Sequence, residues 1–148
     1  MAYLNSPIRA LVYCLGLILC APLLLAADDH SAAFAHGVQL YEAGKFAAAS
    51  KTFKHLSAAA PTNDEFAYWL GKAYGRRAEQ VDWLTAMKYA KLTRCAFERA
   101  VQLNPENVAA VQDLAQYYAD APGFLGGDAA KAAALRAQLK SLTATIPN

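Results

Sequence analysis

The chain has 148 residues and a formal net charge of +2 at pH 7, with 14 Lys or Arg residues against 12 Asp or Glu. That length is enough for one domain and too short for two of ordinary size. A charge so close to neutral argues against general nucleic-acid binding, which needs a clustered basic surface.

The first 27 residues have the layout of a secretory signal peptide. Arg9 precedes an apolar run over residues 10–27, which ends in small residues and is followed by two aspartates. A basic start, an apolar middle and a small-residue cleavage site are the features of such signals. We therefore expect residues 1–27 to be removed and the protein to be periplasmic. Because the run is at the short limit for a spanning helix, an uncleaved inner-membrane anchor facing the periplasm is the alternative.

The next stretch predicts two helices joined by a tight turn. In AAFAHGVQLYEAG the apolar residues recur at helical spacing, and Phe34, Val38 and Tyr41 share a face. Gly44 ends this helix, as glycine commonly does just past a C-terminus. A second apolar stripe follows in KFAAASKTFKHLSAAAP and stops at its proline. The two segments together predict an antiparallel helix hairpin.

The pattern then repeats with an insertion. NDEFAYWLGKAYG predicts the next helix, and its partner extends back through DWLTAMKYAKL to begin near Asp82. The insertion adds about ten residues, or about 15 Å of helix. Trp83, Leu84 and Met87 therefore either fold back on the following unit as core or form an apolar knob that faces a partner.

The third unit contains a glycine-rich loop, APGFLGGDAAKA, after the helix VAAVQDLAQYYAD. Glycines that open a helix can hold phosphate, but no strand precedes them and the lysine and hydroxyl of a Walker loop are missing. Asp128 stands at the helix start, where a carboxylate caps free amides. We interpret the stretch as a structural turn with a cap, formed by Pro122, Gly123, Gly126, Gly127 and Asp128.

The three units in register resemble the tetratricopeptide repeat (TPR) family. The matches are Gly37, Leu40, Tyr41, Gly44, Phe46, Ala49, Phe53 and Pro61, then LGKAY with Phe97, Ala100 and Pro105, then LAQYY. The glycine-rich loop also looks like the APGxxGGDxxKA loop of a group of bacterial exported TPR proteins. The resemblance implies an all-α fold: a short right-handed solenoid of about three antiparallel hairpins, with an extended second helix in the middle repeat. We expect it to span residues 28–148, in units of about 30–63, 64–106 and 107–148.

In that family the first helix of each pair lines a concave groove that holds peptides or partner domains. Carried onto this sequence, the groove residues are Phe34, Val38, Tyr41, Tyr68, Lys72, Arg76, Gln112 and Gln116. Tyr68, Lys72 and Arg76 are spaced at four and would offer an aromatic plate beside two cations to an acidic or aromatic peptide. The alternative is that the two cations form an ordinary solvated stripe.

No nucleophile, base and orienting group converge in this sequence, so we expect no enzyme. Cys95, the one cysteine after the signal, has no ligand spacing with His30, His36 or His55, so we also expect no metal or cofactor. We predict that Cys95 is a small buried residue on a helix, with an intermolecular disulfide as the alternative.

The sequence thus favours a non-catalytic adaptor or scaffold of the bacterial cell envelope that binds a partner protein or peptide. Two alternatives come from other classes. One is a small-molecule or nucleotide-binding protein that uses loop 123–128. The other is a self-associating module, which would make the protein a homodimer.

Overall fold

The computed structural model describes residues 21–144. Residues 1–33 and 34–148 form two compact units, which are described separately. The described part of the first unit belongs to helix α2 (Ala21–Glu42), whose second half lies in the other unit. Most of the predicted signal segment lies outside the described residues. Among those that are described, no helix has the length and apolar character needed to cross a bilayer.

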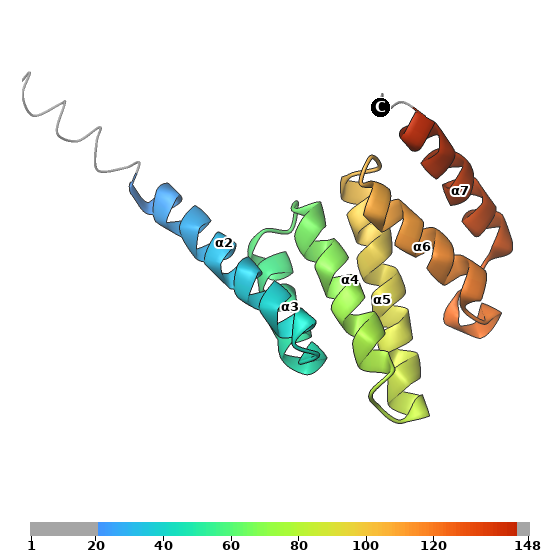
Figure 1. Cartoon of the computed structure of the whole chain (residues 1–148), viewed down its shortest axis with the longest axis horizontal. Helices are drawn as coiled ribbons and strands as arrows, with labels where there is room; N and C mark the ends of the chain where they lie inside the picture. Colours follow the sequence, from blue (N-terminus) through green and yellow to red (C-terminus); the bar gives the residue numbers. More distant parts are fainter. Residues whose placement is uncertain (1–20, 145–148) are drawn as a thin grey trace, which may run out of the picture. The chain divides into compact units, whose positions relative to one another are not determined.

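The second unit continues as a succession of helices (Figure 1). They are α3 (Phe46–Ala59), α4 (Asp64–Ala78), α5 (Trp83–Leu103), α6 (Val108–Asp120), the 3-10 turn η1 (Gly123–Leu125) and α7 (Ala129–Ala144). Each helix from α3 to α6 packs on the next helix along the chain. Within residues 21–144 there is no strand. The predicted all-α fold of antiparallel hairpins is confirmed, including the extended second helix in the middle.

Side-chain caps explain where three of these helices begin. Asn63, Asp82 and Asn107 each accept a hydrogen bond from the backbone amide three residues further on, at 3.0–3.1 Å. Such caps satisfy amides that have no partner within the helix. The Asp82 cap fixes the start of α5 at Trp83, so that α5 has 21 residues against 15 in α4.

A glycine in the left-handed conformation ends α2. Gly44 has a φ of +71°, its amide donates to the carbonyl of Tyr41, and the amide of Lys45 donates to that of Leu40. These two bonds form a Schellman motif, which satisfies the last carbonyls of the helix and turns the chain toward α3.

Two other glycines allow close approach between the helices of a hairpin. A Cβ atom on Gly37 would lie 2.8 Å from the Phe53 ring, and one on Gly71 would lie 2.5 Å from the Phe97 ring. Both distances are below any normal contact, so only glycine fits beside these buried rings. The third hairpin has Ala115 on α6, and α7 carries no aromatic residue. A small side chain is tolerated there because no ring faces it.

An aromatic cluster joins the first hairpin to α4. The Trp69 ring stacks on Phe53 with centroids 5.7 Å apart and meets Phe34 and Tyr41 edge-on, at 6.1 and 5.5 Å. Phe34 also contacts Phe53 and Phe66. Rings in such offset and edge-on pairs add to the stability gained by burial. Phe34 therefore serves as core between α2, α3 and α4.

The structure excludes one alternative for the start of α5 and corrects the prediction for Cys95. Trp83 and Leu84 do not fold back on the third unit as core, because their side chains are 66% and 62% exposed. The six residues by which α5 exceeds α4 correspond to about 9 Å of helix. Cys95 is exposed rather than buried. It lies on the outer face of α5, whereas its neighbours Ala96 and Phe97 point into the core.

Candidate functional site

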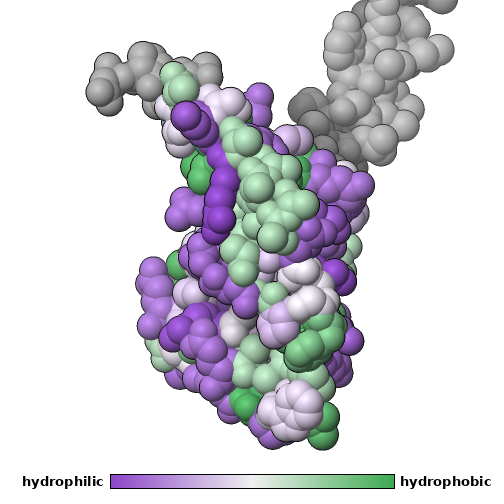
Figure 2. All heavy atoms as spheres, turned by 90° about the vertical axis from the view of Figure 1, so that its right-hand side faces the viewer, coloured by the Kyte–Doolittle hydropathy of each residue, from purple (hydrophilic) through white to green (hydrophobic). Residues whose placement is uncertain are grey.

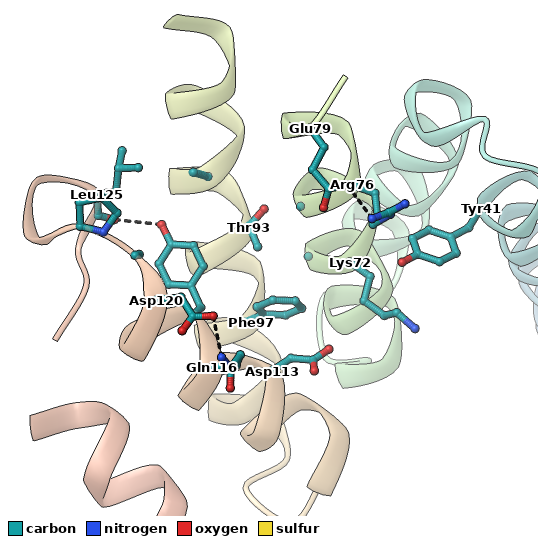
Figure 3. A pocket seen from close by; sticks show the side chains of 16 residues that line it. Tyr41, Lys72, Arg76, Glu79, Thr93, Phe97, Asp113, Gln116, Asp120 and Leu125 are labelled. Carbon is teal, nitrogen blue, oxygen red and sulfur yellow. Dashed lines mark hydrogen bonds and ion pairs between the residues drawn. The ribbon is translucent and has the colours of Figure 1, made fainter. Parts of the chain in front are cut away.

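A hollow of about 470 Å³ opens between α4, α5 and α6, and we call it the groove. Figure 3 shows side chains of α4 on one wall, of α6 on the other and of α5 between them. The lining residues are Tyr41, Gly71, Lys72, Gly75, Arg76, Glu79, Ala90, Thr93, Phe97, Asp113, Gln116, Tyr117, Asp120, Ala121, Pro122 and Leu125.

Small and apolar residues form the floor of the groove. Gly71 and Gly75 are one turn apart on α4, opposite Phe97 and Thr93 of α5. A Cβ atom on Gly75 would meet Thr93 at 3.6 Å, an ordinary contact, so that glycine leaves space open without being required for packing. The missing side chain of Gly75 therefore leaves space open in the floor, whereas the Phe97 ring fills the place beside Gly71.

The rim of the groove carries charges of both signs. Lys72 and Arg76 extend from α4, and Asp113, Gln116 and Asp120 face them from α6 (Figure 3). Two of these side chains already have a partner on their own wall of the groove. Arg76 pairs with Glu79 at 2.5 Å and Gln116 donates to Asp120 at 2.6 Å. Because both contacts are exposed, they stabilise the fold little and can exchange for contacts with a ligand.

The Lys72 ammonium is held by three aromatic rings of the chain itself. Its Nζ lies 4.2 Å from the ring centre of Trp69, 5.2 Å from that of Tyr41 and 5.5 Å from that of Tyr68. Each ring face attracts a cation at such distances. Lys72 thus has internal partners and is fixed in place at the edge of the groove.

Tyr68 joins α4 to α6 at one end of the groove. Its hydroxyl donates to Oδ2 of Asp113 at 3.0 Å. Burial raises the pKa of Tyr68 far above its usual range, and the Asp113 carboxylate raises that pKa further, since ionisation would place two negative charges side by side. Tyr68 is therefore a neutral donor that fixes the Asp113 side chain.

The structure brings together only some of the residues expected in a groove. Tyr41, Lys72, Arg76 and Gln116 line it, whereas Phe34, Val38, Tyr68 and Gln112 do not. The sequence reasoning missed Asp113 and the floor. Helical spacing could have found Asp113, which lies one turn before Gln116. Nothing in the sequence pointed to Thr93 or Phe97, because they come from the second helix of a hairpin.

The glycine-rich loop closes one end of the groove. Pro122 and Leu125 line it, and the Leu125 carbonyl accepts a hydrogen bond from the Tyr117 hydroxyl at 3.0 Å. Gly126 has a φ of +94°, in the left-handed region. A Cβ atom on Gly127 would lie 1.7 Å from the Ala121 carbonyl oxygen. Gly126 and Gly127 are therefore required by the turn itself.

A carboxylate occupies the start of the helix that follows this loop. Oδ1 of Asp128 accepts from the backbone amides of Ala130 and Lys131, at 3.0 and 3.1 Å. A phosphate bound at this helix would need those same amides. The arrangement therefore favours a capped turn over a nucleotide cradle. Over the described part of the chain, no three His, Cys, Asp or Glu side chains are grouped so that they could hold a metal ion.

A comparison with protein-family models finds no match to the chain, and neither does a comparison with curated proteins. Solved structures do match. The chain shares its fold with the type III secretion translocator chaperone SycD of Yersinia enterocolitica. The TM-score is 0.64 at 17% identity over 82% of this chain and 73% of that one. SycD in complex with a peptide of the translocator YopD matches with a TM-score of 0.63, 18% identity and coverage of 81% and 80%. An alternative dimer of SycD matches at 0.62, with the same identity and coverage.

Proposed function

We propose that this chain is a non-catalytic TPR protein that holds a segment of a partner protein in the groove. The observation that carries the proposal is the composition of the groove, which combines an apolar floor with a rim of both charges. A peptide needs this combination, because it has apolar side chains to bury and a polar backbone to satisfy.

The geometry suggests how such a segment would lie. One apolar side chain would fill the space over Gly75, beside Thr93 and the Phe97 ring. The adjoining peptide groups would then reach Arg76 on α4 and Gln116 on α6. The walls carry opposite charges, so the ligand needs no large net charge of its own.

The fold comparison supports this proposal. One of the SycD structures is a complex with a translocator peptide, so a helical-repeat fold of this kind can accommodate a peptide. At 18% identity the likeness concerns the fold, and the argument for this chain rests on its own groove.

A plug in the groove tests the proposal. A library of random peptides on an array would first be used to select binders of the full chain. Ala90→Trp places an indole in the groove floor, and we expect it to weaken the binding of the selected peptides by about tenfold or more. Ala130→Trp is the matched control, since Ala130 is exposed on α7 outside the groove. Equal binding by both variants would move the peptide site elsewhere. The plug is a cleaner test than replacing Lys72, whose loss would disturb the aromatic cluster.

The setting of this function is part of the proposal. The apolar segment at residues 10–27 supports export to the periplasm, with cleavage after residue 27 or retention as an anchor. The intact mass of the protein recovered from its own cells distinguishes the two, because cleavage removes 27 residues. Recovery of uncleaved protein from the cytoplasm would contradict both.

Self-association is a second property to test. One matching SycD structure is described as a dimer, and α5 begins with exposed apolar side chains. Sedimentation of the purified chain over a wide concentration range measures the mass directly. A constant monomer mass at the highest concentration would exclude a homodimer.

A further inference from the structure

A second hollow lies on the other side of the same helices. It measures about 530 Å³ and receives the cations Lys51 and Lys54 from α3, Arg77 from α4 and Lys88 from α5. None of the residues that line it is a carboxylate. We call it the cationic hollow. Four converging positive charges without a carboxylate among them make a strongly anion-attracting surface.

Helical periodicity separates this hollow from the groove. On α4, Arg77 lies 100° from Arg76 and 140° from Lys72 around the helix axis, at 100° per residue. On α5, Lys88 lies about 160° from Ala90, which forms part of the groove floor. A ligand in the groove therefore leaves the cationic hollow free, and the two surfaces can act independently.

One cation of the hollow is held in a fixed position. Arg77 donates from Nη1 to the hydroxyl of Ser50 at 3.3 Å and lies over the Tyr89 ring, 4.4 Å from its centre. Tyr89 in turn packs on Tyr74, with ring centres 5.8 Å apart. A guanidinium stacked and hydrogen-bonded in this way loses little freedom on binding an oxyanion.

The segments of α3 and α5 that border the hollow contain no acidic residue. Neither α3 nor residues 83–97 of α5 contain Asp or Glu. Within residues 30–144, no ion pair shorter than 4.0 Å involves Lys51, Lys54 or Lys88. These lysines are exposed, so their charge is available to a ligand.

An apolar surface adjoins the cationic hollow. A further depression along α5 is lined by Leu84, Met87, Lys88, Lys91, Leu92 and Cys95, and it shares Lys88 and Leu92 with the hollow. At its far end Leu84 projects into solvent. Trp83 is also exposed but lies about 140° from Lys88 around the helix axis, on the groove side of α5. Figure 2 shows one face of the molecule, turned 90° from Figure 1, where hydrophobic residues form patches between hydrophilic ones.

We infer that this face of the protein docks on a lipid bilayer that contains anionic phospholipids. The headgroup phosphates lie at Arg77, Lys54 and Lys88, and the exposed start of α5 enters the boundary between headgroups and acyl chains. Charge complementarity selects the anion, and the adjoining apolar side chains Leu84 and Met87 favour a membrane over an acidic peptide. Lysine stems can lie on apolar surface while their ammonium groups reach phosphate.

Vesicle co-sedimentation of the full chain tests the inference. Phosphatidylcholine vesicles are compared with vesicles that also contain phosphatidylglycerol. The N-terminal apolar segment is the same in every variant, so differences between variants report the α3–α5 face. Lys54→Gln combined with Lys88→Gln should weaken binding to the anionic vesicles about 25-fold, at about fivefold for each lysine. The control combines Arg136→Gln with Lys140→Gln, which removes the same charge from α7 and should change binding less than about twofold.

A second pair of variants tests the apolar contact. Leu84→Ser should weaken vesicle binding about tenfold, by removing an apolar side chain from the bilayer boundary. Phe124→Ser is the matched control, because Phe124 is similarly exposed, at 68%, but lies in η1 beside the groove. Both residues are on the surface, so neither change should affect folding, which circular dichroism checks.

Several results would overturn the inference. They include equal binding to the two vesicle types and equal loss in the α7 control. Binding of poly-glutamate that depends on Lys54 and Lys88, without vesicle binding, would assign the face to an acidic protein. Release from vesicles by millimolar inorganic phosphate would identify a site for the free ion. The groove is judged separately, because peptides selected for it should bind the Lys54→Gln/Lys88→Gln variant normally.

Discussion

The groove and the cationic hollow lie on opposite sides of α4 and α5 and have similar volumes, about 470 and 530 Å³. Their linings differ in kind. Around the groove, Lys72 and Arg76 face Asp113 and Asp120 across an apolar floor, whereas the hollow has cations without a carboxylate. The placement of charge, and not the size of the cavity, therefore separates a surface suited to a peptide from one suited to an anionic layer.

The same stretch of α4 supplies both surfaces. Lys72, Gly75 and Arg76 point to the groove, and Tyr74 and Arg77 point to the hollow. Successive residues turn by 100°, so a single helix between two neighbours can present different chemistry on its two free sides. A substitution on one face should therefore leave the other face unaffected, unless it disturbs the core packing that supports both.

The largest expected effect comes from removing that shared packing. Trp69→Ala deletes the ring that stacks on Phe53 and supports Lys72. We expect a loss of about 3 kcal/mol in the free energy of unfolding, as for large-to-small changes in aromatic cores. Trp83→Ala is the control: that side chain is 66% exposed and should change stability by less than about 0.5 kcal/mol. Urea unfolding measures both, and equal losses would contradict the difference in burial.

A pair of glycines on the groove floor tests how its shape arises. Gly71→Ala should destabilise the protein by about 1–3 kcal/mol, because the new methyl group would overlap the Phe97 ring. Gly75→Ala should instead stabilise it by up to about 1 kcal/mol, since the methyl group meets Thr93 at normal contact distance and alanine favours helix. Thermal unfolding compares the two. A stable Gly71→Ala variant would mean that α4 and α5 can separate without cost.

The fold could be predicted from the sequence because its signals are local and repeated. The glycine–aromatic pairs, the caps and the prolines each act within one hairpin, and three hairpins in register support one another. The start of α5 followed from Asp82 and the phase of Trp83 and Met87. The exposure of Trp83 was left open, because the pattern does not show whether the added turns of α5 pack on a neighbouring helix.

The sites were harder to predict, because they depend on contacts between hairpins. The spacing of Lys72 and Arg76 placed them correctly on one face, but the rings under Lys72 come from two helices. The near-neutral net charge hid the cationic face, since a sum over the chain says nothing about where the acids lie. Cys95 looked like a core residue by type and is exposed by position.

A smaller effect is expected at the contact that joins α4 to α6 beside the groove. Tyr68→Phe removes the hydrogen bond to Asp113 and should cost about 1–2 kcal/mol of stability, since the acceptor is charged. It should also weaken the binding of peptides in the groove, because the Asp113 side chain loses the hydrogen bond that fixes it. Binding to anionic vesicles should stay unchanged. A loss of both activities would show that the two faces are coupled.

The smallest effect is a difference in pH dependence between the two sides. The folded protein holds the protons of Tyr68 and Tyr74 more tightly than the unfolded chain, because burial raises the pKa of both hydroxyls. This contribution is complete below the ordinary tyrosine pKa of about 10 and is lost as the pH rises through the folded pKa. Asp113 raises the pKa of Tyr68 further, whereas Arg77 on the other side lowers that of Tyr74.

Tyr68→Phe should therefore flatten the alkaline loss of stability more than Tyr74→Phe does. Urea unfolding from about pH 9 to about pH 11 measures the slopes. Each variant is compared with the unchanged chain, so that the titration of lysines cancels. Equal slopes of unfolding free energy against pH for the two variants would mean that Asp113 and Arg77 do not act differently on these hydroxyls. The electrostatic contrast between the two sides would then be confined to their exposed rims.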